Sequence, residues 1–147
     1  MALKIPETPD NASINRVMIV DLPGLSIDEE VRGQKAYHLL SSLAVVAYAK
    51  DYRDALKLPE AYTEGSEQVR RQVPLFIERC LQNGDAEARR AAQAIGRRLG
   101  RNLGHILLTL HRGDAVNQAA RPDWTEVEWA RWRSIQQVYL GGGMMSG

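Results

Sequence analysis

Three histidines and a single cysteine are the side chains of this sequence best suited to bind a metal ion or to act as a nucleophile. His105 and His111 are six residues apart, so a helix would point them to different faces, whereas a shared metal needs the i, i+4 spacing. His38 belongs to another predicted helix. Cys80 falls within an apolar helix stripe, which indicates a small buried side chain and not a reactive thiolate. We therefore expect no metal site and assign no catalytic residue.

Arginines recur along two predicted helices and could line a face that binds phosphate or nucleic acid. They are Arg70-Arg71, Arg89-Arg90, Arg97-Arg98 and Arg101. A dedicated nucleic-acid-binding domain is usually strongly basic, whereas this chain has a net charge of +1. Acidic residues such as Asp85 and Glu87 lie close to these arginines, so the pattern favours a solvated face with balanced charges. Nucleic-acid binding is therefore the least favoured function.

A short apolar run at residues 16–20 leads into Asp21-Leu22-Pro23-Gly24. The latter segment resembles the D-x-x-G switch element of GTPases, in which the aspartate reaches magnesium through water and the glycine amide meets the terminal phosphate. Only twenty residues precede it, and none of them forms the G-x-x-x-x-G-K-[ST] loop that holds the other phosphates. An N-K-x-D motif is also missing. The pattern therefore predicts a strand followed by a turn, without GTP binding.

Hydrophobic periodicity predicts a mainly α fold with one or two short strands. Residues 1–15 hold two prolines and few large apolar side chains, which indicates a mobile or extended arm. Residues 16–147 are expected to form a single helical domain, either complete or truncated at its C-terminus. Its body should contain three main helices and one short helix, followed by a C-terminal strand that ends in a glycine loop.

The first main helix is predicted from the capping box Ser26–Glu29 to about Lys57, where Leu58-Pro59 ends it. The second covers about 66–82, with a kink or a start nearer Pro74. The third begins after the cap Asp85 and continues to about His111, and a loop follows over 113–122. The short helix carries Trp124, Trp129 and Trp132 after a cap at Asp123 or Thr125.

Gly96, Gly100 and Gly104 form a row with a spacing of four on the third main helix. Each glycine costs about 1 kcal/mol relative to alanine inside a helix. Three glycines on one face therefore predict that another backbone packs very close to this row.

The C-terminal segment combines a predicted strand over 137–140 with the triplet Gly141-Gly142-Gly143. With the preceding helix around Leu99-Gly100, it resembles the C-terminal half of the sugar-kinase, actin and Hsp70 superfamily, especially ROK-type kinases. The similarity covers roughly the last 50 residues. It implies that Gly141, Gly142 and Gly143 form the loop beside the adenosine of ATP. The family's D-x-G-x-T phosphate loop and its catalytic aspartate have no counterpart here, so ATP binding is expected only in an intact parent protein and not in this chain alone.

Two functions are the leading hypotheses. The resemblance implies an incomplete nucleotide-binding segment of a kinase-like protein that is not catalytically self-sufficient. The alternative is a non-catalytic helical module for protein interaction or oligomerisation, with a second copy or the rest of the parent protein as partner. A single cysteine, the lack of a signal-peptide pattern and the short apolar runs predict a cytoplasmic protein without a membrane segment.

Overall fold

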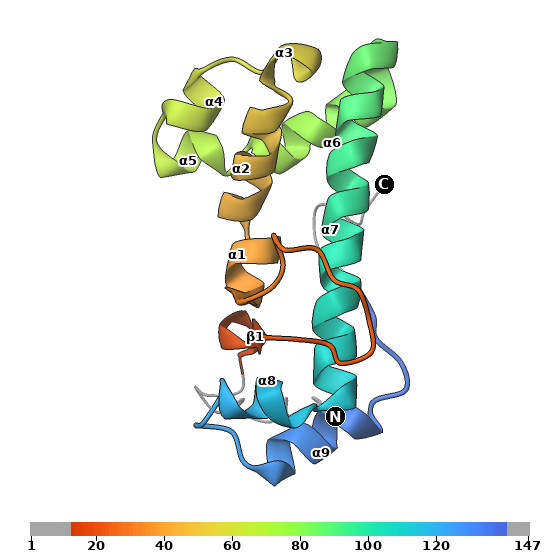
Figure 1. Cartoon of the computed structure of the whole chain (residues 1–147). Helices are drawn as coiled ribbons and strands as arrows, with labels where there is room; N and C mark the ends of the chain where they lie inside the picture. The colour runs from red at the N-terminus through yellow and green to blue at the C-terminus, as the bar shows by residue number, and fades with distance from the viewer. Residues whose placement is uncertain (1–12, 141–147) are drawn as a thin grey trace, which may run out of the picture.

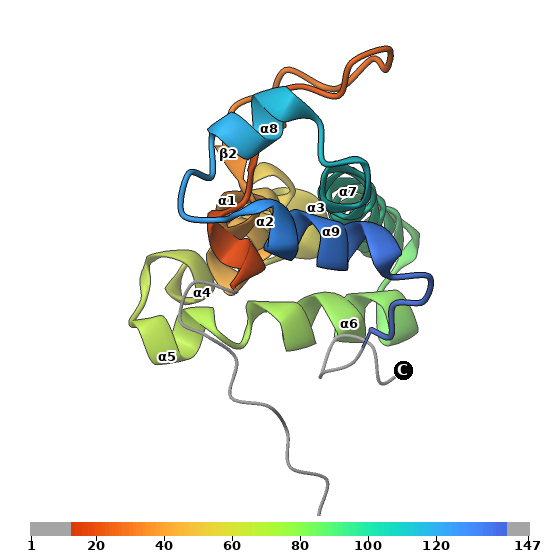
Figure 2. The same cartoon turned by 90° about the horizontal axis from the view of Figure 1, so that it is seen from below.

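The computed structural model describes residues 13–140, and these form a mainly helical fold, as the sequence predicts (Figure 1). The long helix α7 (Ala86–Arg112) is the spine of the molecule. Figure 2 shows this helix nearly end-on, with α6 on one side and α8 on the other. No helix within the described range is long and apolar enough to cross a membrane.

A two-stranded antiparallel sheet occupies the N-terminal part of the described chain. After a single 3-10 turn at Ile14–Arg16, strand β1 (Met18–Ile19) pairs with β2 (Gln34–Lys35). The predicted strand at 16–20 is thus confirmed in its central residues. The helix predicted to begin at Ser26 is wrong, because residues 25–33 form turns that bring β2 back to β1. Gly33, with φ +75°, makes this return possible and donates its amide to the Ile19 carbonyl at 2.7 Å.

Three short helices replace the remainder of the first predicted helix. They are α1 (Ala36–Leu40), α2 (Ser42–Asp51) and α3 (Arg53–Leu56). Ser41 separates the first two, because its side chain accepts a hydrogen bond from the Ala44 amide and so caps α2. The series ends at Lys57 in a left-handed conformation, which is the boundary expected before Leu58-Pro59.

The second predicted helix is also divided. After α4 (Ala61–Glu64), α5 (Glu67–Arg70) begins at the cap Ser66, and α6 (Val73–Asn83) has Pro74 in its first turn. Proline is tolerated there because the first helical amides have no partner within the helix. The predicted start near Pro74 is therefore confirmed.

Helix α7 begins and ends as the sequence predicts. Asp85 accepts a hydrogen bond from the Ala88 amide at 2.8 Å, and Gly113 ends the helix with φ +57°. Its first half packs in a core with α2, α3 and α6, and its second half packs in another core with β1, α1 and α9. One helix therefore connects both cores.

The chain after α7 turns back across its C-terminal end. The predicted loop contains a short helix, α8 (Ala115–Ala119), and α9 (Glu126–Ser134) starts with the predicted Thr125–Glu128 capping box. The strand predicted over 137–140 is wrong, since residues 135–140 run back beside α7 without pairing to a strand in the described range. Gly141, Gly142 and Gly143 lie outside the described residues.

Candidate functional site

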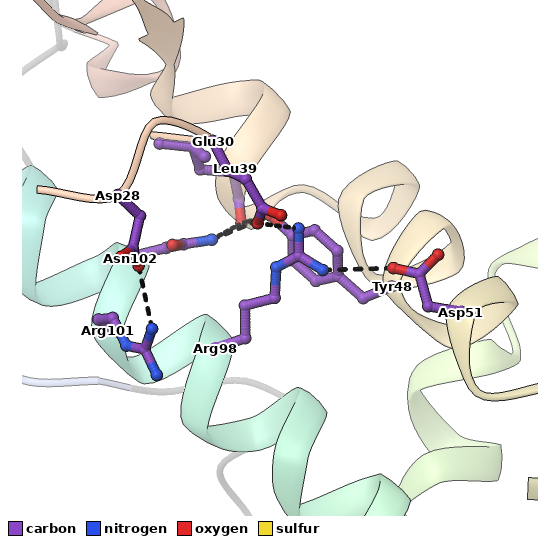
Figure 3. Close-up of polar contacts among 8 residues, drawn as sticks. All are labelled: Asp28, Glu30, Leu39, Tyr48, Asp51, Arg98, Arg101 and Asn102. Atoms are coloured by element: carbon purple, nitrogen blue, oxygen red, sulfur yellow. Dashed lines mark hydrogen bonds and ion pairs between the residues drawn. The ribbon is translucent and has the colours of Figure 1, made fainter. Parts of the chain in front are cut away.

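A buried amide group lies at the middle of α7, between the two cores. The Asn102 side chain is 3% exposed and donates hydrogen bonds to the Leu39 carbonyl at 3.2 Å and to the Tyr48 hydroxyl at 2.9 Å (Figure 3). Tyr48 in turn donates to the Leu39 carbonyl at 3.1 Å. The end of α1 is thus joined to α2 and α7 through three hydrogen bonds. The Leu39 carbonyl, the Tyr48 hydroxyl and the Asn102 amide each take part in two of them.

Arginines of α7 extend this network towards solvent. The Arg98 guanidinium lies 3.9 Å from the centre of the Tyr48 ring and forms ion pairs with Glu30 at 2.7 Å and Asp51 at 3.3 Å. Arg101 pairs with Asp28 at 3.0 Å. Because Asp28 and Glu30 belong to the 25–33 turns, these ion pairs hold that segment against α7 (Figure 3). We call these side chains, with Asn102 and the Leu39 carbonyl, the polar brace.

The polar brace borders a cavity of about 280 Å³. Its chemistry is restricted, because Arg98 and Arg101 already have carboxylate partners. Burial raises the pKa of the Tyr48 phenol, although Arg98 and the hydrogen bond from Asn102 oppose that shift. A phenol with a raised pKa stays protonated near neutral pH. The arrangement therefore connects three helices and a turn, and it presents no activated nucleophile or base.

A second hollow lies on another side of α7, towards α6, and has a volume of about 410 Å³. We call it the outer groove. It is almost entirely apolar, and Glu78 is the only charged side chain among the described residues that line it. Its lining comes from α1, α2, α6, α7 and the C-terminal segment: Leu40, Val45, Pro74, Ile77, Glu78, Leu81, Ala92, Ile95, Gly96, Leu99, Gly100, Leu103 and Leu140.

Gly96 and Gly100 of the α7 glycine row line this groove, and all three glycines of the row face open space. A Cβ atom added at Gly96, Gly100 or Gly104 would meet no other atom within 4 Å. The sequence-based expectation that another backbone packs against these glycines is therefore wrong for the described chain. The buried core contacts of α7 are made by residues outside the row, such as Ile95 and Ile106, and they leave the glycines uncovered.

The C-terminal segment forms one wall of this apolar surface. Leu140 lines the outer groove, and Val138 lines an adjoining hollow of about 420 Å³ beside Leu107 and Trp132. Val138 and Leu140 are 49% and 51% exposed, whereas Tyr139 between them is 88% exposed. This alternation is typical of an extended chain that turns every second side chain towards a neighbour. The apolar surface thus continues along α7 from Gly96 to Leu107.

The histidines and the cysteine do not form a site. Cys80 is buried, and burial raises the pKa of its thiol, which disfavours the reactive thiolate. His38 and His111 are exposed on different helices. Within residues 13–140, no three His, Cys, Asp or Glu side chains lie together in a group that could hold a metal ion.

The D-x-x-G segment is a turn, as predicted. The Leu25 amide donates to the Leu22 carbonyl at 2.9 Å, and Gly24 has φ +85°, which favours glycine at this turn position. The Asp21 carboxylate pairs with Arg32 at 2.6 Å, and this hydrogen bond lowers the pKa of Asp21. The Asp21–Arg32 ion pair therefore links this turn to the segment directly before β2.

Sequence reasoning missed the polar brace. The sequence feature that could have indicated it is Asn102, a polar residue that interrupts an otherwise apolar stripe between Ile95 and Ile106. A buried amide within such a stripe needs partners from neighbouring elements. Those partners, Tyr48 and the Leu39 carbonyl, could not be identified before α1 and α2 were placed.

Comparisons with protein-family models, with curated proteins and with solved structures find no match to this chain. The resemblance to ROK-type kinases remains a prediction. Its nucleotide-binding residues, Gly141, Gly142 and Gly143, are not among the residues that the structure describes.

Proposed function

We propose that this chain is a non-catalytic helical interaction module whose outer groove binds an amphipathic helix of another polypeptide. The observation that carries the proposal is the glycine row of α7, which faces open space at the edge of an apolar groove. Each glycine destabilises the helix by about 1 kcal/mol relative to alanine. Three of them are a considerable cost for a domain whose total stability is about 5–15 kcal/mol.

The spacing of the glycines favours a helix as the bound element. Side chains four residues apart form the ridges of a helix surface, and where these side chains are missing the surface has a shallow furrow. A second helix can place its own ridge in such a furrow, with the two axes crossing at about −50°. Gly96 and Gly100 would allow the two backbones to approach closely, because no side chain separates them.

The lining of the groove favours apolar side chains over a polar small molecule. A volume of about 410 Å³ is within the usual size range of ligand pockets, but such pockets contain several convergent polar groups. Among the residues at 13–140 that line the outer groove, Glu78 is the one charged side chain. Leucine or methionine side chains from an amphipathic helix match this environment.

The test is a titration of the isotope-labelled chain with a neutral amphipathic peptide that carries leucines at i, i+3, i+4 and i+7. We expect saturable shifts of the amide resonances of Gly96, Gly100 and Leu103. Gly100→Leu should fill the groove and weaken binding by about tenfold or more, equivalent to the loss of about 1.4 kcal/mol. Arg90→Leu adds the same side chain at an exposed α7 position outside the groove and should leave the affinity unchanged. Shifts confined to other surfaces would contradict the proposal.

A second proposal, from the resemblance, is an incomplete nucleotide-binding segment of a kinase-like protein. It is supported by the alternating exposure of residues 138–140 directly before Gly141, as expected for a chain that could enter a sheet at this point. The chain alone should show no phosphotransfer from ATP to sugars. Measurable sugar phosphorylation by the purified 147-residue chain would contradict this second proposal.

A further inference from the structure

We infer that residues 136–140 compete with the partner helix for the apolar surface of α7, so that the free protein covers part of its own binding site. We call these residues the strap. The inference rests on the proposed function and specifies how access to the same groove is controlled. It follows from the side chains that the strap places beside α7, from the few interactions that hold the strap, and from the width of a bound helix.

The strap lies along a row of leucines on α7, formed by Leu99, Leu103 and Leu107 and called here the leucine row. Val138 lines the hollow that contains Leu107. Leu140 lines the outer groove, which contains Leu103. The strap therefore runs antiparallel to α7 (Figure 1). Two residues of extended chain span about 6.6 Å, and four residues of a helix rise by about 6 Å, so the spacing of the two strap side chains matches that of the leucine row.

Few interactions hold the strap in this position. The hydrogen bond from the Ile135 amide to the Trp132 carbonyl, at 3.2 Å, belongs to the end of α9. Beyond it, no hydrogen bond joins the strap to another element within residues 13–140, and the Tyr139 hydroxyl bonds only to the Gln137 side chain of the strap itself. All five strap residues are exposed. A segment with few buried contacts opens at a low cost in free energy, so another ligand of the same surface can displace it.

A helix bound over the glycine row would overlap the strap. Gly100 lies three residues before Leu103, so the glycine row and the leucine row are neighbours on the surface of α7. A helix with its side chains is about 10–12 Å wide, and its axis lies about 8–10 Å from that of the helix on which it packs. Centred on Gly100, such a helix extends over Leu103, which lines the groove together with Leu140. The partner helix and the strap therefore exclude each other.

This competition has a definite effect on affinity. When only a fraction of the molecules is free to bind, the apparent dissociation constant is the intrinsic constant divided by that fraction. Displacing the strap by mutation raises the fraction and strengthens binding. A strap that served as a fixed wall of the groove would have the opposite effect, because its loss would remove contacts from the bound helix.

The test measures the affinity of the full chain for the neutral leucine peptide described above, by fluorescence anisotropy of the labelled peptide. Val138→Ser/Leu140→Ser removes the apolar side chains of the strap and should strengthen binding about threefold or more. Tyr139→Ser is the matched control, because it changes a side chain that is 88% exposed, and it should leave the affinity unchanged. All three positions are exposed, so the fold should be retained, and circular dichroism checks this.

A second measurement follows the strap itself. In ¹⁵N relaxation experiments on the wild type, residues 136–140 should become more mobile when the peptide is added to saturation. A fixed wall would become more rigid under the same conditions, since the bound helix would pack against it.

The possible outcomes separate the inference from the proposed function. Saturable binding by the wild type that is lost in Gly100→Leu but unchanged or weakened in Val138→Ser/Leu140→Ser would overturn the inference and leave the proposed function standing. Binding by the double variant alone would support both. Failure of the peptide to bind either protein would refute both. Self-association of the wild type in the ultracentrifuge, abolished by Gly100→Leu, would identify a second copy as the occupant and overturn the inference.

Discussion

Replacing the glycines of α7 by alanine should make the protein more stable. The structure gives the magnitude directly, because a Cβ atom at Gly96 or Gly104 meets nothing within 4 Å and therefore causes no clash. What remains is the helix propensity difference, which favours alanine by about 0.8–1.0 kcal/mol at each position. Eight residues separate the two sites, or about 12 Å along the helix, so their effects should add. The double variant should gain about 1.6–2 kcal/mol.

The assay is urea denaturation followed by tryptophan fluorescence, with Trp124 and Trp129 reporting from the core around the second half of α7. The midpoint should rise while the dependence on urea stays constant. Gly113→Ala is the matched control, because Gly113 has φ +57°, a conformation that costs an alanine about 1–2 kcal/mol. That variant should be less stable than the wild type. A loss of stability in Gly96→Ala/Gly104→Ala would refute the reasoning, since it would show that the row is packed against another part of the protein.

Three further predictions concern the polar brace, the start of α7 and the C-terminal segment. Asn102→Ala should lower the free energy of unfolding by about 1–3 kcal/mol, because it leaves a buried carbonyl and hydroxyl with fewer partners; in urea denaturation, Tyr48→Phe should cost less, since Asn102 still donates to the Leu39 carbonyl. The pKa of Asp85 is lowered from 3.8, first by the hydrogen bond from the Ala88 amide and then by Lys57. Its contribution to stability is therefore fully present above pH 3.8 and is lost as the pH falls through the lower folded-state value, so urea midpoints of the wild type and Asp85→Ala should converge in that acidic range. Val138→Ser/Leu140→Ser should increase the mobility of residues 136–140 in ¹⁵N relaxation measurements, whereas Tyr139→Ser, which alters a side chain that is 88% exposed, should not.

The sequence predicted those elements whose determinants are local. Asp85 and Gly113 mark the ends of α7 through hydrogen bonding and backbone conformation, and Thr125 with Glu128 does the same for the start of α9. Each signal acts over a few residues, so it can be recognised without knowledge of the fold.

The errors arose where a distant contact overrides a local pattern. Ser26 to Glu29 has capping-box spacing, but β1 needs a partner for its backbone groups, and Gly33 brings β2 back to meet it. The predicted strand at 137–140 lacks such a partner in the described range, and Val138 and Leu140 line hollows beside α7 instead. Sequence alone could not reveal which of these segments finds a neighbour.

The glycine row shows why periodicity could indicate a surface without indicating its occupant. A spacing of four places Gly96, Gly100 and Gly104 on one face, and this inference holds whatever lies opposite. Whether that face is covered depends on the placement of α6 and of the other helices.

The two sides of α7 explain why the outer groove stays open. Asn102 and Arg98 draw α1, α2 and the 25–33 turns to one side of the helix, while Ile95 and Ile106 fix its buried face in the two cores. Once these contacts are made, α6 covers only part of the remaining surface, and the glycine row provides no side chains that could close the gap. The polar brace therefore determines which side of α7 is covered by other elements, and the glycine row determines which side remains accessible. A helix with leucines on one face would complete the packing that α7 lacks on its own.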